Sequence, residues 1–206
     1  MYKYLTQGLL LGLAYVAPIG MQNLYVINTA LSGNKKRTYQ VALFTIFFDI
    51  LLALACFFGI GILLKNIPSL KSSILLIGSI LVMLIGLKLI REAGEIDNSI
   101  EKRNNSLFQI FLTCFVVTWL NPQAIIDDSL LLRGFHASLP PNTAIYFILG
   151  FCTASFLWFT SISSITLFLN DKLNNKVIRA INIICGSVLI FFGLKLGYSF
   201  IQLILS

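Results

Sequence analysis

The sequence predicts an all-α membrane protein in which six transmembrane helices form two inverted repeats of three. Three observations predict this fold: long apolar segments along the whole chain, a biased distribution of Lys and Arg between them, and paired motifs in the two halves. Of the 206 residues, 57% are hydrophobic and only 11% are charged, whereas a soluble domain carries about 25% charged residues. The chain is therefore expected to be a single transmembrane domain, residues 1–206.

The first apolar segment comprises residues 5–31, and Met1–Tyr4 leads into it without a small-residue cleavage site. We therefore expect no removable signal peptide. A bilayer core requires about 20 residues of helix, and further segments of that kind are 41–64, 72–90, 106–132, 143–169 and 177–205. Their apolar residues are continuous and do not alternate with polar ones, as the strands of a membrane barrel would require. Each segment is predicted to be helical, because a helix satisfies its own backbone in lipid.

The connections between the segments predict how the chain is oriented. Nine basic residues fall on one side of the membrane and four on the other. Because cytoplasmic loops carry an excess of Lys and Arg, the first side is predicted to be cytoplasmic and both termini are expected outside. The nine are Lys35, Lys36, Arg37, Arg91, Lys102, Arg103, Lys172, Lys176 and Arg179, and the four are Lys3, Lys65, Lys71 and Arg133.

The two halves of the chain, residues 5–90 and 106–205, resemble each other on either side of a charged loop at 91–105. Pro18 and Pro122 interrupt the first and fourth segments, 104 residues apart, and Gly-Leu-Lys-Leu occurs at 86–89 and at 193–196, 107 residues apart. Because each half has an odd number of helices, the second half enters the membrane in the opposite orientation to the first. This is the inverted-repeat plan of many secondary transporters. Lys88 and Lys195, inside the two repeated words, are expected to extend to opposite interfaces or to neutralise an Asp.

Polar side chains follow both predicted helix breaks. A proline inside a helix frees a backbone carbonyl, and in lipid such a break is tolerated where it faces protein or a water-filled cavity. A kink that only helps packing is the alternative, but polar side chains rarely face lipid. We prefer a central binding site between the breaks, with the candidate residues Pro18, Gly20, Gln22 and Asn23 in the first segment and Asn121, Pro122, Gln123, Asp127 and Asp128 in the fourth.

Three carboxylates lie within predicted helices, namely Asp49, Asp127 and Asp128, and the other five lie in loops. A carboxylate at a helix centre costs about 2.5–3.5 kcal/mol on insertion scales. Asp49 and Asp127 are therefore predicted to face a partner or water and to bind a cation or a proton. A shift of 104 residues relates Asn23 to Asp127, so both are expected at the same position after a break. Asp128 is expected nearer the outer end and better hydrated, beside water or Arg133.

Several other classes of function are not favoured. The basic residues form no single patch, so nucleic acid is not an expected partner. The cysteines are isolated within apolar segments, and His136 is the only histidine. Metal sites built from Cys and His, a cofactor and Cys–His catalysis are therefore not predicted. A membrane-embedded enzyme is the weaker alternative to a transporter.

The two broken-helix motifs resemble those of the lysine/arginine exporter family, the LysE-type amino-acid exporters. Residues 17–23, Ala-Pro-Ile-Gly-Met-Gln-Asn, resemble its first-helix signature, and residues 119–127, Trp-Leu-Asn-Pro-Gln-Ala-Ile-Ile-Asp, resemble its fourth-helix signature. Asp49 stands where the family has an acidic residue in the second helix, and the resemblance covers the whole chain. It implies export of lysine, arginine or a similar basic amino acid across a bacterial inner membrane, driven by the membrane potential or the proton gradient.

The resemblance also implies roles for the candidate residues. Asp49 and Asp127 would bind the cationic group or the proton, and Gln22 and Asn23 would bind the backbone groups of the amino acid. Relatives in the wider superfamily move neutral amino acids or metal cations, and both cargoes stay open as alternatives. Membrane lipid is an expected partner. A homo-oligomer also stays open, because Gly8-xxx-Gly12 and Gly193-xxx-Gly197 allow close helix approach, more often within one bundle than between chains.

Overall fold

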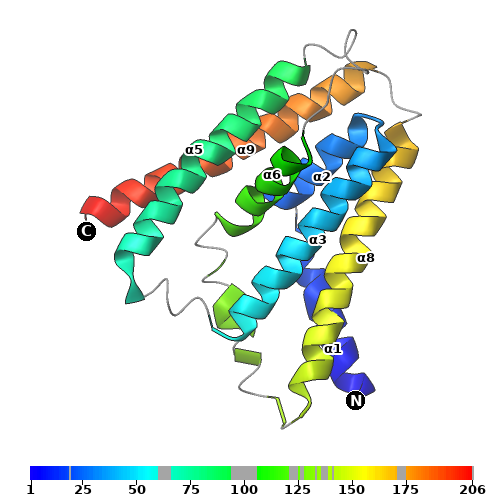
Figure 1. The fold of residues 1–206 in the computed structure, drawn as a ribbon, viewed down its shortest axis with the longest axis vertical. Coiled ribbons are helices and arrows are strands. Elements are labelled where there is room, and N and C mark those ends of the chain that lie inside the picture. Colours follow the sequence, from blue (N-terminus) through cyan, green and yellow to red (C-terminus); the bar gives the residue numbers. More distant parts are fainter. Residues whose placement is uncertain are drawn as a thin grey trace.

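A computed structural model describes residues 1–18, 20–59, 66–93, 106–120, 125, 128–132, 134–135, 139–140, 142–170 and 175–205. Within these ranges the regular elements are helices, arranged as an elongated bundle (Figure 1). They are α1 (Tyr2–Val16), α2 (Met21–Leu31), α3 (Lys35–Phe57), α5 (Pro68–Ala93), α6 (Leu107–Trp119), α8 (Ala144–Asn170) and α9 (Asn175–Leu205). The all-α fold class predicted from the apolar segments is confirmed.

Four helices are long and apolar enough to cross a membrane, namely α3, α5, α8 and α9, and the bent pair α1–α2 adds a fifth if it counts as one span. The protein is therefore a multi-pass membrane protein. The predicted segments 72–90, 143–169 and 177–205 agree with α5, α8 and α9 to within a few residues. α6 has 13 residues, too short for a span, and most of 121–127 lies outside the described residues. The count of six spans stays a prediction.

α3 begins at Lys35, six residues before its predicted segment, 41–64, and ends at Phe57. The side chain of Asn34 caps this helix by accepting a hydrogen bond from the backbone N–H of Arg37 at 3.0 Å. Such a cap satisfies one of the free donors of the first turn. The three basic residues that the sequence assigned to a loop are therefore the first turn of a helix.

The first apolar segment is broken where Pro18 predicted it. α1 ends at Val16, α2 begins at Met21, and the two helices are bent by 74° relative to each other. Proline has no N–H to donate and its ring clashes with the preceding turn, so the helix ends before it. Gly20 is the N-cap of α2, with extended backbone angles (φ −109°, ψ −174°) and without a side-chain cap.

Two helix pairs pack backbone against backbone and lie side by side in Figure 1, α1 with α8 and α5 with α9. A Cβ atom at Gly8 would lie 2.0 Å from the carbonyl oxygen of Phe147, and one at Gly150 would lie 2.1 Å from that of Leu5. Glycine allows this approach because it has no side chain. The predicted Gly8 motif therefore packs against α8 of the same chain.

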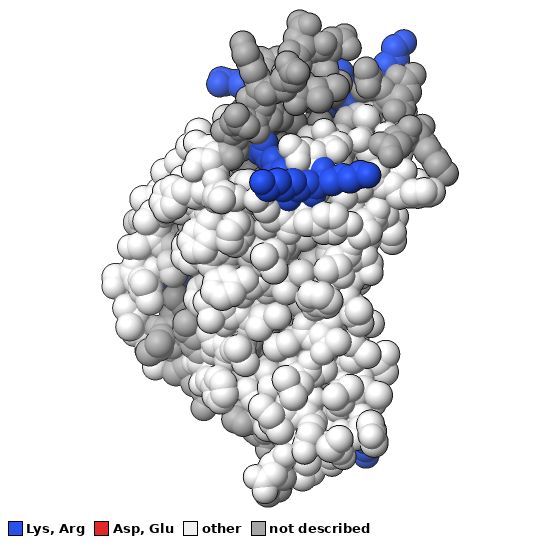
Figure 2. Space-filling view, turned by 45° about the vertical axis from the view of Figure 1, so that its right-hand side comes forward, with Lys and Arg blue, Asp and Glu red and all other residues white. Residues whose placement is uncertain are grey.

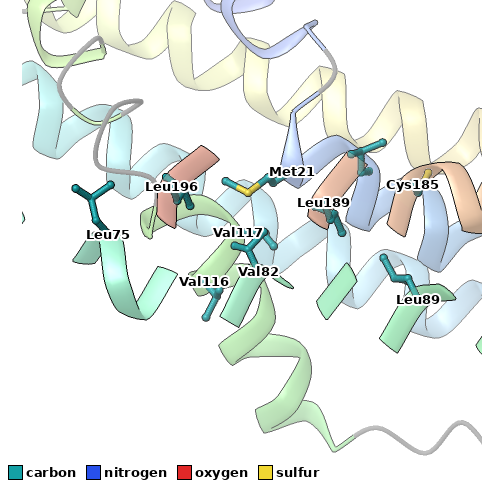
Figure 3. Close-up of a cluster of buried hydrophobic side chains, with 10 residues drawn as sticks. Met21, Leu75, Val82, Leu89, Val116, Val117, Cys185, Leu189 and Leu196 are labelled. Atoms are coloured by element: carbon teal, nitrogen blue, oxygen red, sulfur yellow. The ribbon is translucent and has the colours of Figure 1, made fainter. Parts of the chain in front are cut away.

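The distribution of side chains suits a lipid environment. Large apolar residues such as Leu84, Phe156 and Phe191 are more than half exposed on the outside, whereas Thr45 and Ser155 inside are fully buried. One apolar cluster joins α2, α5, α6 and α9 in the interior (Figure 3); it consists of Met21, Leu24, Leu75, Val82, Leu89, Val116, Val117, Cys185, Leu189 and Leu196. On the face shown in Figure 2, most Lys and Arg side chains gather at one end above a broad band without charge.

Candidate functional site

A cavity of about 160 Å³ lies at the break between α1 and α2. Its lining residues are Tyr15, Val16, Pro18, Gly20, Met21, Gln22, Asn23, Asp49, Leu52, Val117, Thr118 and Asp128. Six of the ten predicted site residues are in this lining: Pro18, Gly20, Gln22, Asn23, Asp49 and Asp128. The other four, Asn121, Pro122, Gln123 and Asp127, lie outside the described residues.

Asn23 closes the helix break from within. Its Nδ2 group donates to the carbonyl oxygen of Val16 at 3.0 Å and to that of Pro18 at 2.8 Å. These are carbonyls that the interrupted helix can no longer pair in the regular way. The Oδ1 atom of Asn23 accepts a hydrogen bond from Nε1 of Trp158 on α8 at 2.9 Å. Both ends of the amide are thus bonded to protein, so Asn23 fixes the shape of the break.

Asp49 lies near the middle of α3 and is only 4% exposed. Gln22 Nε2 donates to its Oδ1 at 3.3 Å, and the Ser155 hydroxyl donates to its Oδ2 at 2.5 Å. Among the described residues, the two hydrogen-bond donors to Asp49 come from α2 and α8, and both are neutral. A buried carboxylate held only by neutral donors keeps its affinity for a cation or a proton, since neither donor compensates its charge.

Asp128 is buried as deeply as Asp49, at 3% exposed. The expectation that it would be the wetter of the acids is therefore wrong. Its distance along the chain from the predicted break suggested the membrane surface, but its side chain lies in the cavity lining. The hydroxyl of Tyr15, in the last turn of α1, hydrogen-bonds to the Asp128 carboxylate. Arg133, the partner considered from the sequence, lies outside the described residues.

The sequence did not single out four residues that build this site. Tyr15 and Thr118 line the cavity, while Ser155 and Trp158 reach its polar residues from α8. Ser155 is one of several Ser and Thr residues in the segment 143–169, and the sequence does not rank one of these hydroxyls above the others.

The arrangement suits a small cationic molecule. Two buried carboxylates and the Tyr15 and Thr118 hydroxyls supply acceptors, and the uncapped start of α2 supplies backbone N–H donors. An engineered cavity of about 150 Å³ holds benzene, so the present volume accommodates one small organic group. A whole amino acid with a long side chain would require the cavity to widen.

Comparison with known proteins identifies relatives along the whole chain. A family model described as LysE type translocator matches residues 13–200. Proteins named arginine exporter protein ArgO are similar: the one from Klebsiella pneumoniae subsp. pneumoniae is 32% identical over 217 aligned positions that cover all of both chains. Those from Shigella flexneri and Escherichia coli are 31% identical over 203 positions, covering 96% of this chain and 94% of theirs. No solved structure matches significantly.

Proposed function

This chain belongs to the LysE type translocator family, and we propose that it exports a basic L-amino acid, arginine or lysine, from the cytoplasm. The family and the relatives named arginine exporter support amino-acid export, and they indicate a transporter and not an enzyme. The family resemblance predicted from the two broken-helix motifs is thereby confirmed. The relatives' names make arginine the first cargo to test.

The observation that carries this proposal is the pair of buried carboxylates, Asp49 and Asp128, in one cavity at a helix break. A guanidinium group has five N–H donors in a fixed fork that fits carboxylate oxygens, and an ammonium group has three. Moving such a cation out of water is unfavourable unless an anion compensates it. Two acids in the cavity provide that compensation.

The start of α2 completes the recognition of an amino acid. Gly20, Met21, Gln22 and Asn23 all line the cavity, and the N-cap residue, Gly20, has no side chain to cap this helix end. The first N–H groups of a helix and its dipole favour an anion, and half-helix N-termini bind anionic substrate groups in other transporters. We assign the α-carboxylate of the cargo to this helix end and its cationic groups to Asp49 and Asp128.

The remaining candidates extend the same site. We propose that Asp127 belongs to this site together with Asn121, Pro122 and Gln123, which would form its second broken element. The repeat shift from Asn23 supports this role for Asp127. Asn23 is assigned a shaping role, because its amide holds the carbonyls of Val16 and Pro18.

We further propose that the two halves form six transmembrane helices as an inverted repeat. Support comes from the contact of α5 with α9. A Cβ at Gly86 would lie 2.7 Å from the oxygen of Gly186, and a Cβ at Gly193 would lie 3.1 Å from that of Ser79. Gly193 lies 107 residues after Gly86 in the sequence, and Gly186 lies 107 residues after Ser79. The same shift therefore relates the Gly86–Gly186 contact to the Gly193–Ser79 contact. A two-fold axis across an antiparallel pair produces this pattern.

The proposed energy source follows from charge. A cation that leaves a cell with a negative interior moves against the potential, at about 2.3 kcal/mol per 100 mV. An inward proton for each outward cation cancels that charge movement. Asp49 and Asp128 can hold either a proton or a cation, so the same carboxylates would couple the two flows across the inner membrane.

The deciding test is efflux from vesicles that contain the purified protein and labelled arginine. We expect efflux from wild type, competition by lysine on the loaded side, and no competition by threonine. Asp49→Asn and Asp128→Asn keep the side-chain size but remove the charge, and each is expected to abolish efflux while inserting normally. Equal transport of arginine and threonine, or normal efflux from both variants, would contradict the proposal.

A further inference from the structure

We propose that a groove between α5 and α6 binds an anionic phospholipid, with one acyl chain in the groove and the phosphate on Lys88 and Arg91. This site is separate from the cavity at the helix break, and its ligand is not the cargo. The groove has a volume of about 180 Å³. Its lining residues are Leu81, Leu84, Ile85 and Lys88 from α5 and Leu112, Thr113 and Val116 from α6.

The α5 wall of the groove is one continuous stripe. Its members follow the helical spacing i, i+3, i+4 and i+7, from Leu81 to Lys88, so they lie on the same helix face. Arg91 is three residues further and extends the stripe. At the base, Val116 is 3% exposed and belongs to the interior cluster with Val82 (Figure 3). The groove is therefore apolar along its length and basic at one end.

The basic end lies where a lipid headgroup would lie. The apolar part of α5 that could cross the membrane ends at Arg91, and Lys88 is about 4.5 Å short of that end at 1.5 Å per residue. Both side chains are exposed, and a long basic side chain extends to the interface. Leu81 lies about 10 Å deeper along the helix by the same rise. The groove thus runs from the membrane surface into the hydrocarbon, which is the path of an acyl chain.

Charge at this end favours an anionic lipid over a zwitterionic one. α9 packs against α5 and extends beyond its end, because a Cβ at Gly186, eleven residues into α9, would already lie 2.6 Å from Cγ1 of Ile90 near the end of α5. The first turns of α9 add Lys176 and Arg179, which are also exposed, and most basic residues on the face in Figure 2 gather at one end. Basic residues at the membrane surface attract anionic lipid.

The chain supplies a matched control for Lys88. Lys195 occupies the third position of the second Gly-Leu-Lys-Leu word and is likewise exposed on a long apolar helix, α9. Ten residues of α9 follow it, and it lies outside the groove lining. Lys195→Gln therefore removes the same charge from a similar local sequence without touching the proposed site.

The experiment measures lipid retention by native mass spectrometry on the full-length protein in detergent. The protein is titrated with phosphatidylglycerol or with phosphatidylcholine of identical chains. We expect one retained phosphatidylglycerol and weaker retention of phosphatidylcholine. Lys88→Gln combined with Arg91→Gln should weaken phosphatidylglycerol binding about thirtyfold, since each basic residue at the membrane surface contributes about 1 kcal/mol, while Lys195→Gln should retain the lipid like wild type.

A second variant tests the apolar part without changing charge. Thr113→Phe fills the groove from α6, and it should displace the lipid while the protein elutes as a single species in size exclusion. Equal retention of the two lipids, unchanged retention in the Lys88/Arg91 variant, or an equal loss in Lys195→Gln would overturn the proposal. So would a dimer that covers the groove and excludes phosphatidylglycerol. If the wild-type protein retained phosphatidylglycerol as expected but showed no arginine efflux, only the proposed function would be contradicted.

Discussion

The hydroxyl of Ser155 on α8 donates a hydrogen bond to the Asp49 carboxylate on α3, across 106 residues of sequence. This separation falls between the offsets of 104 and 107 residues that relate the sequence motifs of the two halves. The contact fixes the orientation of one of the two acids in the cavity. It therefore relates the packing of α3 against α8 directly to the charge of the site.

Ser155→Ala removes this donor and is expected to destabilise the protein by about 1.5–3 kcal/mol, the usual range for a hydrogen bond to a charged group. Arginine efflux should slow as well, because Asp49 loses its fixed orientation. Ser163→Ala is the matched control: Ser163 is equally buried on α8, but its hydroxyl has no hydrogen-bond partner among the described residues. Thermal midpoints in detergent that fall equally for both variants would contradict the assignment.

Tyr15→Phe tests the second acid. The aromatic ring stays, together with its contact to Phe151 at 5.6 Å between centroids, and only the hydroxyl that bonds Asp128 is lost. Asp128 should then bind the cargo cation more readily, so KM for arginine is expected to fall several-fold and the maximal efflux rate to fall because release is slower. Both quantities are obtained from efflux rates measured at a series of arginine concentrations inside the vesicles. Tyr198→Phe, on an exposed position of α9, should leave both unchanged.

Asn23→Asp tests the closure of the helix break. A carboxylate has no donor for the carbonyls of Val16 and Pro18, and each unsatisfied buried group costs about 1–3 kcal/mol. We expect a strong loss of thermal stability and of efflux. Trp158→Phe removes only the hydrogen bond to Oδ1 and should be milder. The idea fails if Trp158→Phe proves the more damaging of the two.

Gly150→Ala tests the close packing of α1 on α8. The new methyl would lie 2.1 Å from the carbonyl oxygen of Leu5, and the backbones must separate. Overpacking of this kind typically costs about 1–3 kcal/mol. Gly134→Ala has nothing within 4 Å of the new atom and serves as the control. Unfolding midpoints followed by tryptophan fluorescence are expected to fall for Gly150→Ala alone.

The orientation of the chain gives a further prediction. Both termini lie away from the end of the bundle where α5 ends and α9 begins (Figure 1). Together with the positive-inside rule, this supports termini outside the cytoplasm. A periplasmic reporter fused after residue 206 should be active, and a fusion within the 91–105 loop should be inactive. The reverse pair of activities would refute this orientation.

The length of the apolar segments was sufficient to predict the all-helical fold class of the described residues. Apolar length alone located α5, α8 and α9, and the geometry of proline located the break before Met21. The start of α3 was missed because Lys35 and its basic neighbours resemble a loop until the Asn34 cap is seen. Such a cap depends on one side-chain rotamer, which an apolar pattern does not encode.

The site was predicted only in part, because the sequence identifies a site residue only where placing it in lipid is unfavourable. Pro18, Gln22 and Asp49 were recognised because a helix break and a buried charge are unfavourable in lipid wherever they occur. Ser155 and Tyr15 carry no such penalty. They matter because helices that are distant in the sequence pack together around the cavity. Asp128 was placed too near the surface because position along a helix says nothing about the direction in which a side chain points.

The exchanged contacts of α5 and α9 have an energetic consequence for the transport cycle. If the cavity opens alternately to each side by swapping the conformations of the two halves, the contacts at Gly86 and Gly193 merely trade places. This interface then contributes equally to both states and gives neither an advantage. The resting preference of the carrier must come from positions where the halves differ, such as Asn23 against Asp127. Substitutions there should shift which side the empty protein faces, in addition to their effect on stability or cargo binding.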